Sequence, residues 1–184
     1  WNSYSINTKA NIGPNNGKKY SINEKIFIKN LNEKFNKEKK ITYKKSFNNI
    51  IRVIKGPHFD YFSNKSKDFF FKEEYSVTNL SDRMGMRLKG TKLENILNNN
   101  IKSEGLIKGT IQVPGDGNPI ILLADHGTIG GYPKIAHVIS ADLDKVAQLI
   151  PRSKIKFKQV NLVEAENLFK DYLIDTNKYL NECN

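Results

Sequence analysis

From residue 50 onward the hydrophobic positions form short apolar runs separated by glycine and proline. Runs rich in β-branched and aliphatic residues predict strands, which we place at residues 50–54, 75–77, 86–88, 107–113, 120–124, 135–140 and 154–160. The last of these alternates apolar and polar residues with a period of two. Many short strands with frequent turn residues indicate a mainly β barrel or sandwich rather than βαβ units.

Three segments have the spacing of helices instead. Residues 67–74 predict a short helix, residues 142–150 predict a second that stops at Pro151, and residues 162–180 predict a C-terminal helix. The first 45 residues differ from the rest, because they contain a turn signal, GPNNG at 13–17, and only one short apolar patch at 26–28. We therefore expect a division into residues 1–45, the end of a structure that begins upstream of Trp1, and residues 46–184, the barrel.

The net charge of +11 raises the question of nucleic-acid binding. Residues 1–75 hold 16 Lys and Arg against 7 Asp and Glu, and the remaining residues hold 14 against 12. Because the lysines of the front alternate with asparagine, they indicate an AT-rich genome rather than a nucleic-acid surface, and we predict no nucleic-acid partner. No apolar run is long enough to span a bilayer. A lone cysteine, Cys183, excludes a disulfide framework and predicts a cytoplasmic protein.

The segment SDRMGMRLKG at 81–90 is the first with candidate chemistry. Arg83 and Arg87 would share one face of a strand, and their planar guanidinium groups are suited to a carboxylate or a phosphate. The alternative is a surface ion pair between Asp82 and Arg83 beside a turn.

A second candidate follows the apolar run at 120–124, where Asp125 and His126 enter a glycine-rich loop. Its backbone N–H groups are able to approach an anion closely, although a glycine-rich hairpin with a satisfied histidine is an equal alternative. Glu104 is either a buried acid or a solvated loop residue. His58, His126 and His137 are too scattered to form a metal site, so we predict no metal, and His137 is expected in the core or barrel wall.

Three strings together resemble the biotin-dependent carboxyltransferase domain family, also called allophanate hydrolase subunit 2. They are RVIKGP at 52–57, SDRMGMRLKG at 81–90 and SEGLIKGTIQVPGDGNPIILLADHGTIGGYPKIAHVISADL at 103–143. The resemblance runs from about residue 50 to about residue 160. It implies a cyclophilin-like β-barrel, the second of a tandem pair, with a short helix and a C-terminal helix. Residues 1–45 would then be a remnant of the first barrel and its connection.

The resemblance also implies the site residues. Matching positions assign catalysis to Arg83, Arg87 and Asp125, and substrate binding to Glu104, Gln112, Gly130, Gly131 and Tyr132. The chain departs from the family at Gly127, where members commonly have glutamine.

The function implied by the resemblance is that of a subunit of an ATP-dependent 5-oxoprolinase, which opens 5-oxoproline to glutamate. ATP would be bound by the complex, whose other members are a lactam-utilisation subunit and a homologous subunit similar to allophanate hydrolase subunit 1 or to the 5-oxoprolinase B subunit. One alternative is transfer of CO2 from carboxybiotin, as co-substrate, to urea or a related amide. Another is a non-enzymatic regulatory subunit that binds a kinase inhibitor.

Overall fold

The computed structural model describes residues 6–8, 10–26, 48–96 and 101–183, which belong to two compact units, Trp1–Lys40 and Ile41–Asn184. In the first unit the predicted turn is a 3-10 helix, η1 (Asn15–Gly17). Gly17 has a φ of +72°, and a Cβ there would lie 2.2 Å from the carbonyl carbon of Asn11, so only glycine fits. Most of the apolar patch at 26–28 and the end of the predicted segment 1–45 lie outside the described residues.

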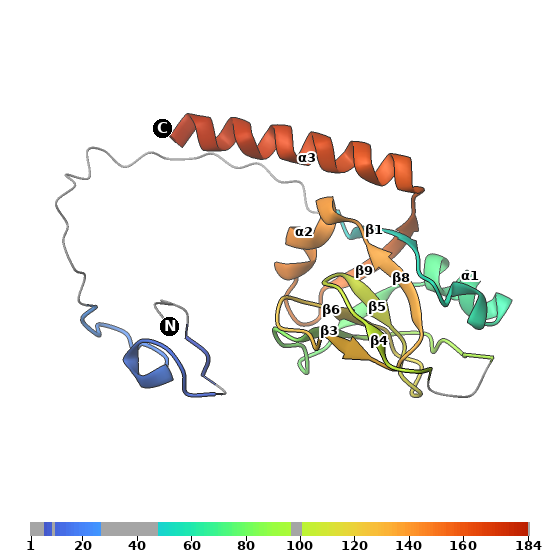
Figure 1. Cartoon of the computed structure of the whole chain (residues 1–184), viewed down its shortest axis with the longest axis horizontal. Helices are drawn as coiled ribbons and strands as arrows, with labels where there is room; N and C mark the ends of the chain where they lie inside the picture. Colours follow the sequence, from blue (N-terminus) through green and yellow to red (C-terminus); the bar gives the residue numbers. More distant parts are fainter. Residues whose placement is uncertain (1–5, 9, 27–47, 97–100, 184) are drawn as a thin grey trace. The chain divides into compact units, whose positions relative to one another are not determined.

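Seven strands of the described part of the second unit close into a barrel (Figure 1). Their order around the barrel is β1-β8-β5-β6-β3-β2-β9, and β9 pairs with β1 to close it. The β1–β9 pair is parallel and every other pair in the barrel is antiparallel. The strands are β1 (Ile50–Lys55), β2 (Tyr75–Val77), β3 (Gly85–Lys89), β5 (Thr110–Gln112), β6 (Ile120–Leu122), β8 (Lys134–Val138) and β9 (Lys154–Gln159).

Buried apolar residues alternate with more exposed residues along the strands, and the buried ones fill the interior of the barrel. Ile51 and Val53 of β1 are fully buried, and on β9 Ile155 and Phe157 point inward between exposed lysines. The short helix α1 (Asn64–Lys72) covers this region, and its Phe70 stacks on Phe157 with ring centroids 4.5 Å apart. Each such side chain contributes about 1.5–3 kcal/mol when it leaves water. The predicted mainly β barrel is therefore confirmed.

The helices differ from prediction mainly at their ends. Helix α1 begins three residues before the predicted 67 because the Ser63 hydroxyl accepts the backbone N–H of Ser66 as an N-cap. Helix α2 (Leu143–Ala147), preceded by the 3-10 helix η3 (Ser140–Asp142), is shorter than the predicted 142–150. Helix α3 (Leu162–Cys183) begins where Asn161 Oδ1 accepts the Glu164 N–H at 2.8 Å.

The first turns of α3 pack on the barrel. Ala165, Leu168 and Tyr172 contact a small apolar cluster that includes Val160, and the Tyr172 hydroxyl donates to Asp144 of α2. Figure 1 shows α3 next to α2. None of the helices in the described part of the chain has the length and apolar character that crossing a bilayer requires.

Two strands are shorter than predicted for local reasons. Segment 107–113 becomes β5 only from Thr110, because Gly109 has a φ of +92° and the Thr110 N–H bonds back to the Ile107 carbonyl. Segment 120–124 ends at Leu122, before a turn at 124–125. Two strands of two residues, β4 (Glu104–Gly105) and β7 (Ile129–Gly130), pair with each other and were not predicted.

Candidate functional site

Five of the eight predicted site residues lie around the start of β8, in a group that we call the Lys134 cluster. It consists of His58, Glu104, Gln112, Lys134 and the turn Gly130, Gly131 and Tyr132. Three segments far apart in sequence meet here: the turn after β1, the β4–β7 pair, and the ends of β5 and β8.

The turn after β1 approaches β8 unusually closely. The Gly56 N–H donates to the Ile135 carbonyl at 2.9 Å, and the His58 N–H donates to the Lys134 carbonyl at 3.2 Å. A Cβ at Gly56 would lie 2.4 Å from the Lys134 carbonyl oxygen, so glycine is required for this contact. The result is that the His58 ring lies beside the backbone of Lys134.

Lys134 is a buried cation paired with a half-exposed carboxylate. The residue is only 5% exposed, and its Nζ lies 2.9 Å from Glu104 Oε2. The hydrogen bond from Lys134 lowers the pKa of Glu104, and the charge of Lys134 adds to this effect against the opposing effect of desolvation. Glu104 is therefore ionised at neutral pH, and β4 presents it opposite Gly130 on β7.

His58 is held as a neutral ring. Burial lowers its pKa most, the nearby charge of Lys134 lowers it further, and Glu104 partly opposes both. Its Nδ1 accepts the Lys134 backbone N–H at 3.3 Å, which leaves the proton on Nε2, 3.7 Å from Glu104 Oε2. His58 thus presents an N–H group toward the carboxylate and is poorly suited to gain a second proton.

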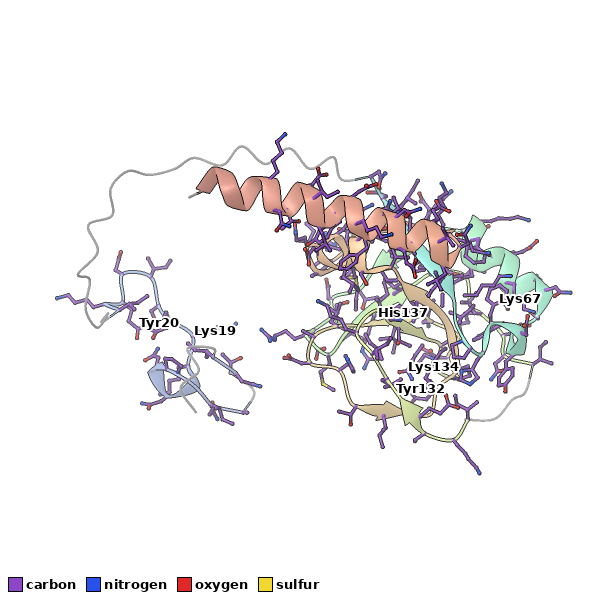
Figure 2. The ribbon with its side chains drawn as sticks, turned by 45° about the horizontal axis from the view of Figure 1, so that its top comes forward. Lys19, Tyr20, Lys67, Tyr132, Lys134 and His137 are labelled. Atoms are coloured by element: carbon purple, nitrogen blue, oxygen red, sulfur yellow. The ribbon has the colours of Figure 1, made fainter. Side chains whose placement is uncertain are left out.

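Gln112 and the glycine turn complete the cluster. Gln112 is 5% exposed, and its Nε2 donates to the Tyr132 carbonyl at 3.4 Å, a bond that does not involve Oε1. A Cβ at Gly130 would lie 3.0 Å from this Nε2 and 2.8 Å from the Leu106 side chain. Figure 2 shows the half-exposed Tyr132 close to Lys134.

Arg83 and Asp125 form a separate pair at the adjoining ends of β3 and β6. Arg83 Nε and Nη2 donate to the two carboxylate oxygens of Asp125 at 2.6 and 3.0 Å. The backbone places them, because the Asp125 N–H donates to the Arg83 carbonyl at 2.9 Å beyond the paired strands. The hydrogen bond and charge of Asp125 raise the pKa of Arg83. The pair uses two of the five guanidinium N–H donors and leaves the outer edge for a ligand.

The structure does not place Arg83 with Arg87 by strand alternation. Arg83 precedes β3, whereas Arg87 lies within it and is exposed on the outer face of the barrel. The predicted alternative of an Asp82–Arg83 pair is also replaced, because the guanidinium fork binds Asp125 and Asp82 Oδ1 accepts the N–H groups of Met84 and Gly85.

The other histidines have local partners. His126 Nδ1 lies 2.6 Å from the Gly127 carbonyl oxygen. His137, on β8, is half-buried beside Thr110, and burial lowers its pKa, as expected for a residue of the barrel wall. Within the described ranges, no group of three or more His, Cys, Asp or Glu residues is placed to hold a metal ion.

Sequence reasoning missed His58 and Lys134 as members of the site. The available signal was Lys134, a lysine that opens an apolar strand whose next residues, Ile135 and Ala136, are buried. A lysine is almost never buried without a partner. That partner, Glu104, lies 30 residues earlier in the chain and becomes a neighbour only through the β4–β7 pair.

The described part of the second unit is a closed β-barrel domain with a cluster of polar residues at the end of β5 and the start of β8. The chain belongs to the family described as carboxyltransferase domain, subdomain A and B, whose model matches residues 1–159.

Similar proteins are of two kinds. The 5-oxoprolinase C subunit of Haemophilus influenzae is 43% identical over 119 residues, which are 65% of this chain and 38% of that protein. Its counterpart in Escherichia coli is 40% identical over 117 residues, or 64% of this chain and 38% of that protein. The crystal structure of the K. lactis urea amidolyase superposes on this chain with a TM-score of 0.68 and 28% sequence identity. The match covers 73% of this chain and 9% of the urea amidolyase chain. This chain therefore spans well under half the length of these relatives.

Proposed function

We propose that this chain belongs to a subunit of an ATP-dependent 5-oxoprolinase, which opens 5-oxoproline to glutamate together with a homologous partner subunit and a lactam-utilisation subunit. The likeness to two 5-oxoprolinase C subunits supports the reaction class. A composition with a single cysteine is compatible with the cytoplasm, where we place the complex.

The observation that favours 5-oxoproline over urea is the Arg83–Asp125 pair. 5-Oxoproline carries a carboxylate and urea carries none. Asp125 binds Nε and Nη2 of Arg83 and so fixes the orientation of the other edge of the guanidinium group. The Arg83 side chain is 78% exposed. An oriented guanidinium edge binds a carboxylate with two parallel hydrogen bonds. In this proposal Arg83 binds the substrate carboxylate and Asp125 positions Arg83.

The Lys134 cluster is a second polar site, separate from Arg83. Gln112 and Lys134 lie level with Ile120 and Arg87 across the strands, whereas Arg83 lies beyond Gly85 and Leu122, about 13 Å further along the strand direction. A 5-oxoproline molecule held by Arg83 would not reach this cluster, so the Lys134 ammonium, fixed by Glu104, would hold another anionic group of the reaction. His58, which stays neutral, keeps the Lys134 backbone in place through its Nδ1 and is a positioning residue. Arg87 keeps the predicted role of a second anion contact, which Arg87→Ala tests.

The described residues of the site do not fit a triphosphate, since Asp125 and Glu104 each offset the charge of one cation, Arg83 and Lys134, and leave little net positive charge for its several negative charges. We therefore place ATP elsewhere in the complex, where it supplies the phosphoryl group that activates the lactam oxygen. No step in this chain is assigned to it.

The test is 5-oxoproline-dependent ATPase activity of the full-length protein with its partner subunits. Arg83→Lys keeps the charge but loses the two-pronged edge, so the KM for 5-oxoproline should rise roughly tenfold or more. Lys134→Met should lower kcat instead. A matched control is Lys72→Ala, which removes an exposed lysine that is also paired with a carboxylate, Asp68, on α1. An intact complex without this ATPase activity would overturn the proposal.

A second candidate is transfer of CO2 from carboxybiotin to urea or a related amide, favoured by the likeness to the urea amidolyase structure. A single carboxylate fits the outer edge of Arg83, which would then hold the carboxylate of carboxybiotin. Carboxybiotin supplies the CO2 when bound. Decarboxylation of free carboxybiotin that depends on urea, and not on 5-oxoproline, would favour this candidate.

A further inference from the structure

A pocket of about 410 Å³ lies on another wall of the barrel, formed by β2, β3 and the start of β9. This wall is separated from β5 and β8 by β6 on one side and by β1 on the other. Three cations and three polar side chains line what we call the β2 pocket: Lys89, Arg152, Lys154, Ser76, Thr78 and Asn79.

The strand register explains why two of the cations converge. Ser76 of β2 is the direct neighbour of Lys89 on β3 and of Lys154 on β9. Directly opposed residues of adjacent strands project to the same face with Cβ atoms about 5 Å apart. The half-buried Ser76 hydroxyl therefore lies between two exposed lysine side chains.

The third cation comes from a residue in an uncommon backbone conformation. Arg152 has a φ of +74°, in the left-handed region that costs a non-glycine residue on the order of 1 kcal/mol. Two hydrogen bonds hold it there: the Arg152 N–H donates to the Val77 carbonyl at 2.8 Å, and the Val77 N–H donates to the Ser153 carbonyl at 2.9 Å. The same two bonds place the arginine at the mouth of the pocket.

The positive charge of the β2 pocket is only partly compensated. Among the ion pairs of the described residues, one carboxylate reaches its cations: Glu74 Oε2, 3.6 Å from Lys154 Nζ. Lys89 and Lys154 lie on the two strands that flank β2, about 10 Å apart, so an anion above Ser76 would lie between their ammonium groups.

We propose that the β2 pocket binds a phosphate group. Three cations match the three terminal oxygens of a phosphate, whereas a carboxylate offers two. Thr78 Oγ1 accepts the Leu80 N–H at 3.3 Å, so its own hydroxyl proton is left to donate to a phosphate oxygen. The proposal rests on this pocket alone and does not depend on the reaction assigned to the Lys134 cluster.

Isothermal titration calorimetry of the full-length protein with inorganic phosphate, pyrophosphate and ATP tests it. Arg152→Gly removes a cation at a φ that glycine adopts freely, so it should fold and bind pyrophosphate roughly three- to tenfold more weakly. Glu74→Gln frees Lys154 from its competitor and should tighten binding about twofold. The matched control is Lys158→Ala, which removes the same charge from the outer face of β9 about 13 Å from Lys154, beyond the screening length.

The opposite signs expected for Arg152→Gly and Glu74→Gln distinguish a site from general loss of structure. Tighter binding of ATP than of pyrophosphate, with the same dependence on both variants, would identify a nucleotide as the source of the phosphate. The reverse order would identify a free phosphate or pyrophosphate. Equal weakening by Arg152→Gly and Lys158→Ala, or no saturable binding of any probe up to about 10 mM, would overturn the proposal. The proposal would also be overturned if a short polyglutamate peptide bound more tightly than the phosphates and its binding changed in the same way in Arg152→Gly and Glu74→Gln.

Discussion

Two arginine–aspartate pairs in this domain have the same geometry and different surroundings. In each, the arginine donates through Nε and Nη2 to both carboxylate oxygens: Arg52 to Asp142 at 3.0 and 2.6 Å, and Arg83 to Asp125 at 2.6 and 3.0 Å. The side chains of the first pair are 30% and 3% exposed, and those of the second are 78% and 38% exposed. Geometry alone therefore does not determine how much an ion pair contributes to stability, because the contribution also depends on exposure to solvent.

The buried pair joins β1 to η3. Besides the guanidinium, Asp142 accepts the backbone N–H of Arg52 at 2.8 Å, so three hydrogen bonds satisfy one buried carboxylate. The same contacts raise the pKa of Arg52. Removing one partner from such a pair leaves an uncompensated charge in a poorly solvated place. In the exposed pair, water is able to replace either partner.

The first prediction concerns the buried pair and has the largest effect. Asp142→Ala should lower the free energy of unfolding by about 3 kcal/mol, because it removes three hydrogen bonds and leaves Arg52 without its counter-charge. Urea denaturation measures the loss, and the corresponding fall in Tm is roughly 6–12 °C for a domain of this size. A double variant with Arg52→Ala should be less destabilised than the sum of the single variants. A loss below about 1 kcal/mol would contradict the comparison.

The second prediction concerns the intermediate case, Lys134 and Glu104, whose side chains are 6% and 49% exposed. Lys134→Met keeps the buried aliphatic stem and removes the charge, so we expect a loss of about 1–2 kcal/mol, with Glu104 turning to water. The variant should also raise the pKa of Glu104 toward its ordinary value, because the hydrogen bond from Lys134 is the main cause of its lowering. NMR titration of the Glu104 carboxyl measures this. An unchanged pKa would show that the bond is not formed in solution.

The third prediction concerns pH and the buried ring of His58. Its folded pKa lies below 6.5, so as the pH falls through 6.5 the unfolded chain binds the proton first and the free energy of unfolding decreases. The loss continues until the pH reaches the folded pKa. Glu104 contributes in a separate window, since its lowered pKa makes stability fall below about pH 4.5.

The matched variant for this pH dependence is His58→Asn. The asparagine oxygen is able to accept the Lys134 backbone N–H as Nδ1 does, but it does not titrate. The fall in stability between pH 6.5 and the folded pKa should therefore become shallower. Part of the fall should remain, because burial also lowers the pKa of His137. An identical slope in wild type and variant would exclude His58 as its source.

The sequence predicted the barrel better than the site because the two depend on different distances along the chain. The β-branched run at 50–54 and the alternation at 154–160 are local and identify β1 and β9. The bonds of the site join residues far apart, such as Arg83 and Asp125, 42 residues apart, and Lys134 and His58, 76 apart. No local pattern specifies which strands become neighbours, so both arginines were expected to act together when only Arg83 has this carboxylate partner.

Glycine positions gave a mixed signal for the same reason. The glycine loop at 127–131 was recognised as a place of close approach, and Gly130 and Gly131 do lie against Gln112 and the backbone of Ile101. The strand pair β4–β7, of which only β7 lies in that loop, was missed, because two residues are too few for a period to show. Gly56 entered the sequence analysis only as part of the string RVIKGP, whereas its contact with the Lys134 carbonyl positions His58.

The fourth prediction concerns Gly127, where the resemblance implied a glutamine. A Cβ there would lie 3.5 Å from the Ile129 carbonyl oxygen, an ordinary contact, so Gly127→Gln should change the free energy of unfolding by less than about 1 kcal/mol. If a glutamine at this position contacts the substrate, 5-oxoproline-dependent ATPase activity of the complex should rise. Gly56→Ala is the contrasting variant, because its Cβ would come within 2.4 Å of the Lys134 backbone carbonyl oxygen, and it should lose both stability and activity.

The smallest effect on stability is expected at the exposed pair. Asp125→Asn keeps one acceptor for the Arg83 fork and turns an N–H group toward its other donor, so the guanidinium loses its fixed orientation. The free energy of unfolding should change by less than about 0.5 kcal/mol, as is usual for solvated pairs. The KM for 5-oxoproline should nevertheless rise severalfold, because substrate binding would then include the cost of ordering Arg83. Urea denaturation and ATPase kinetics of the same variant separate the two quantities. A stability loss near that of Asp142→Ala would show that the exposed pair supports the fold, and an unchanged KM would remove Asp125 from the positioning of Arg83.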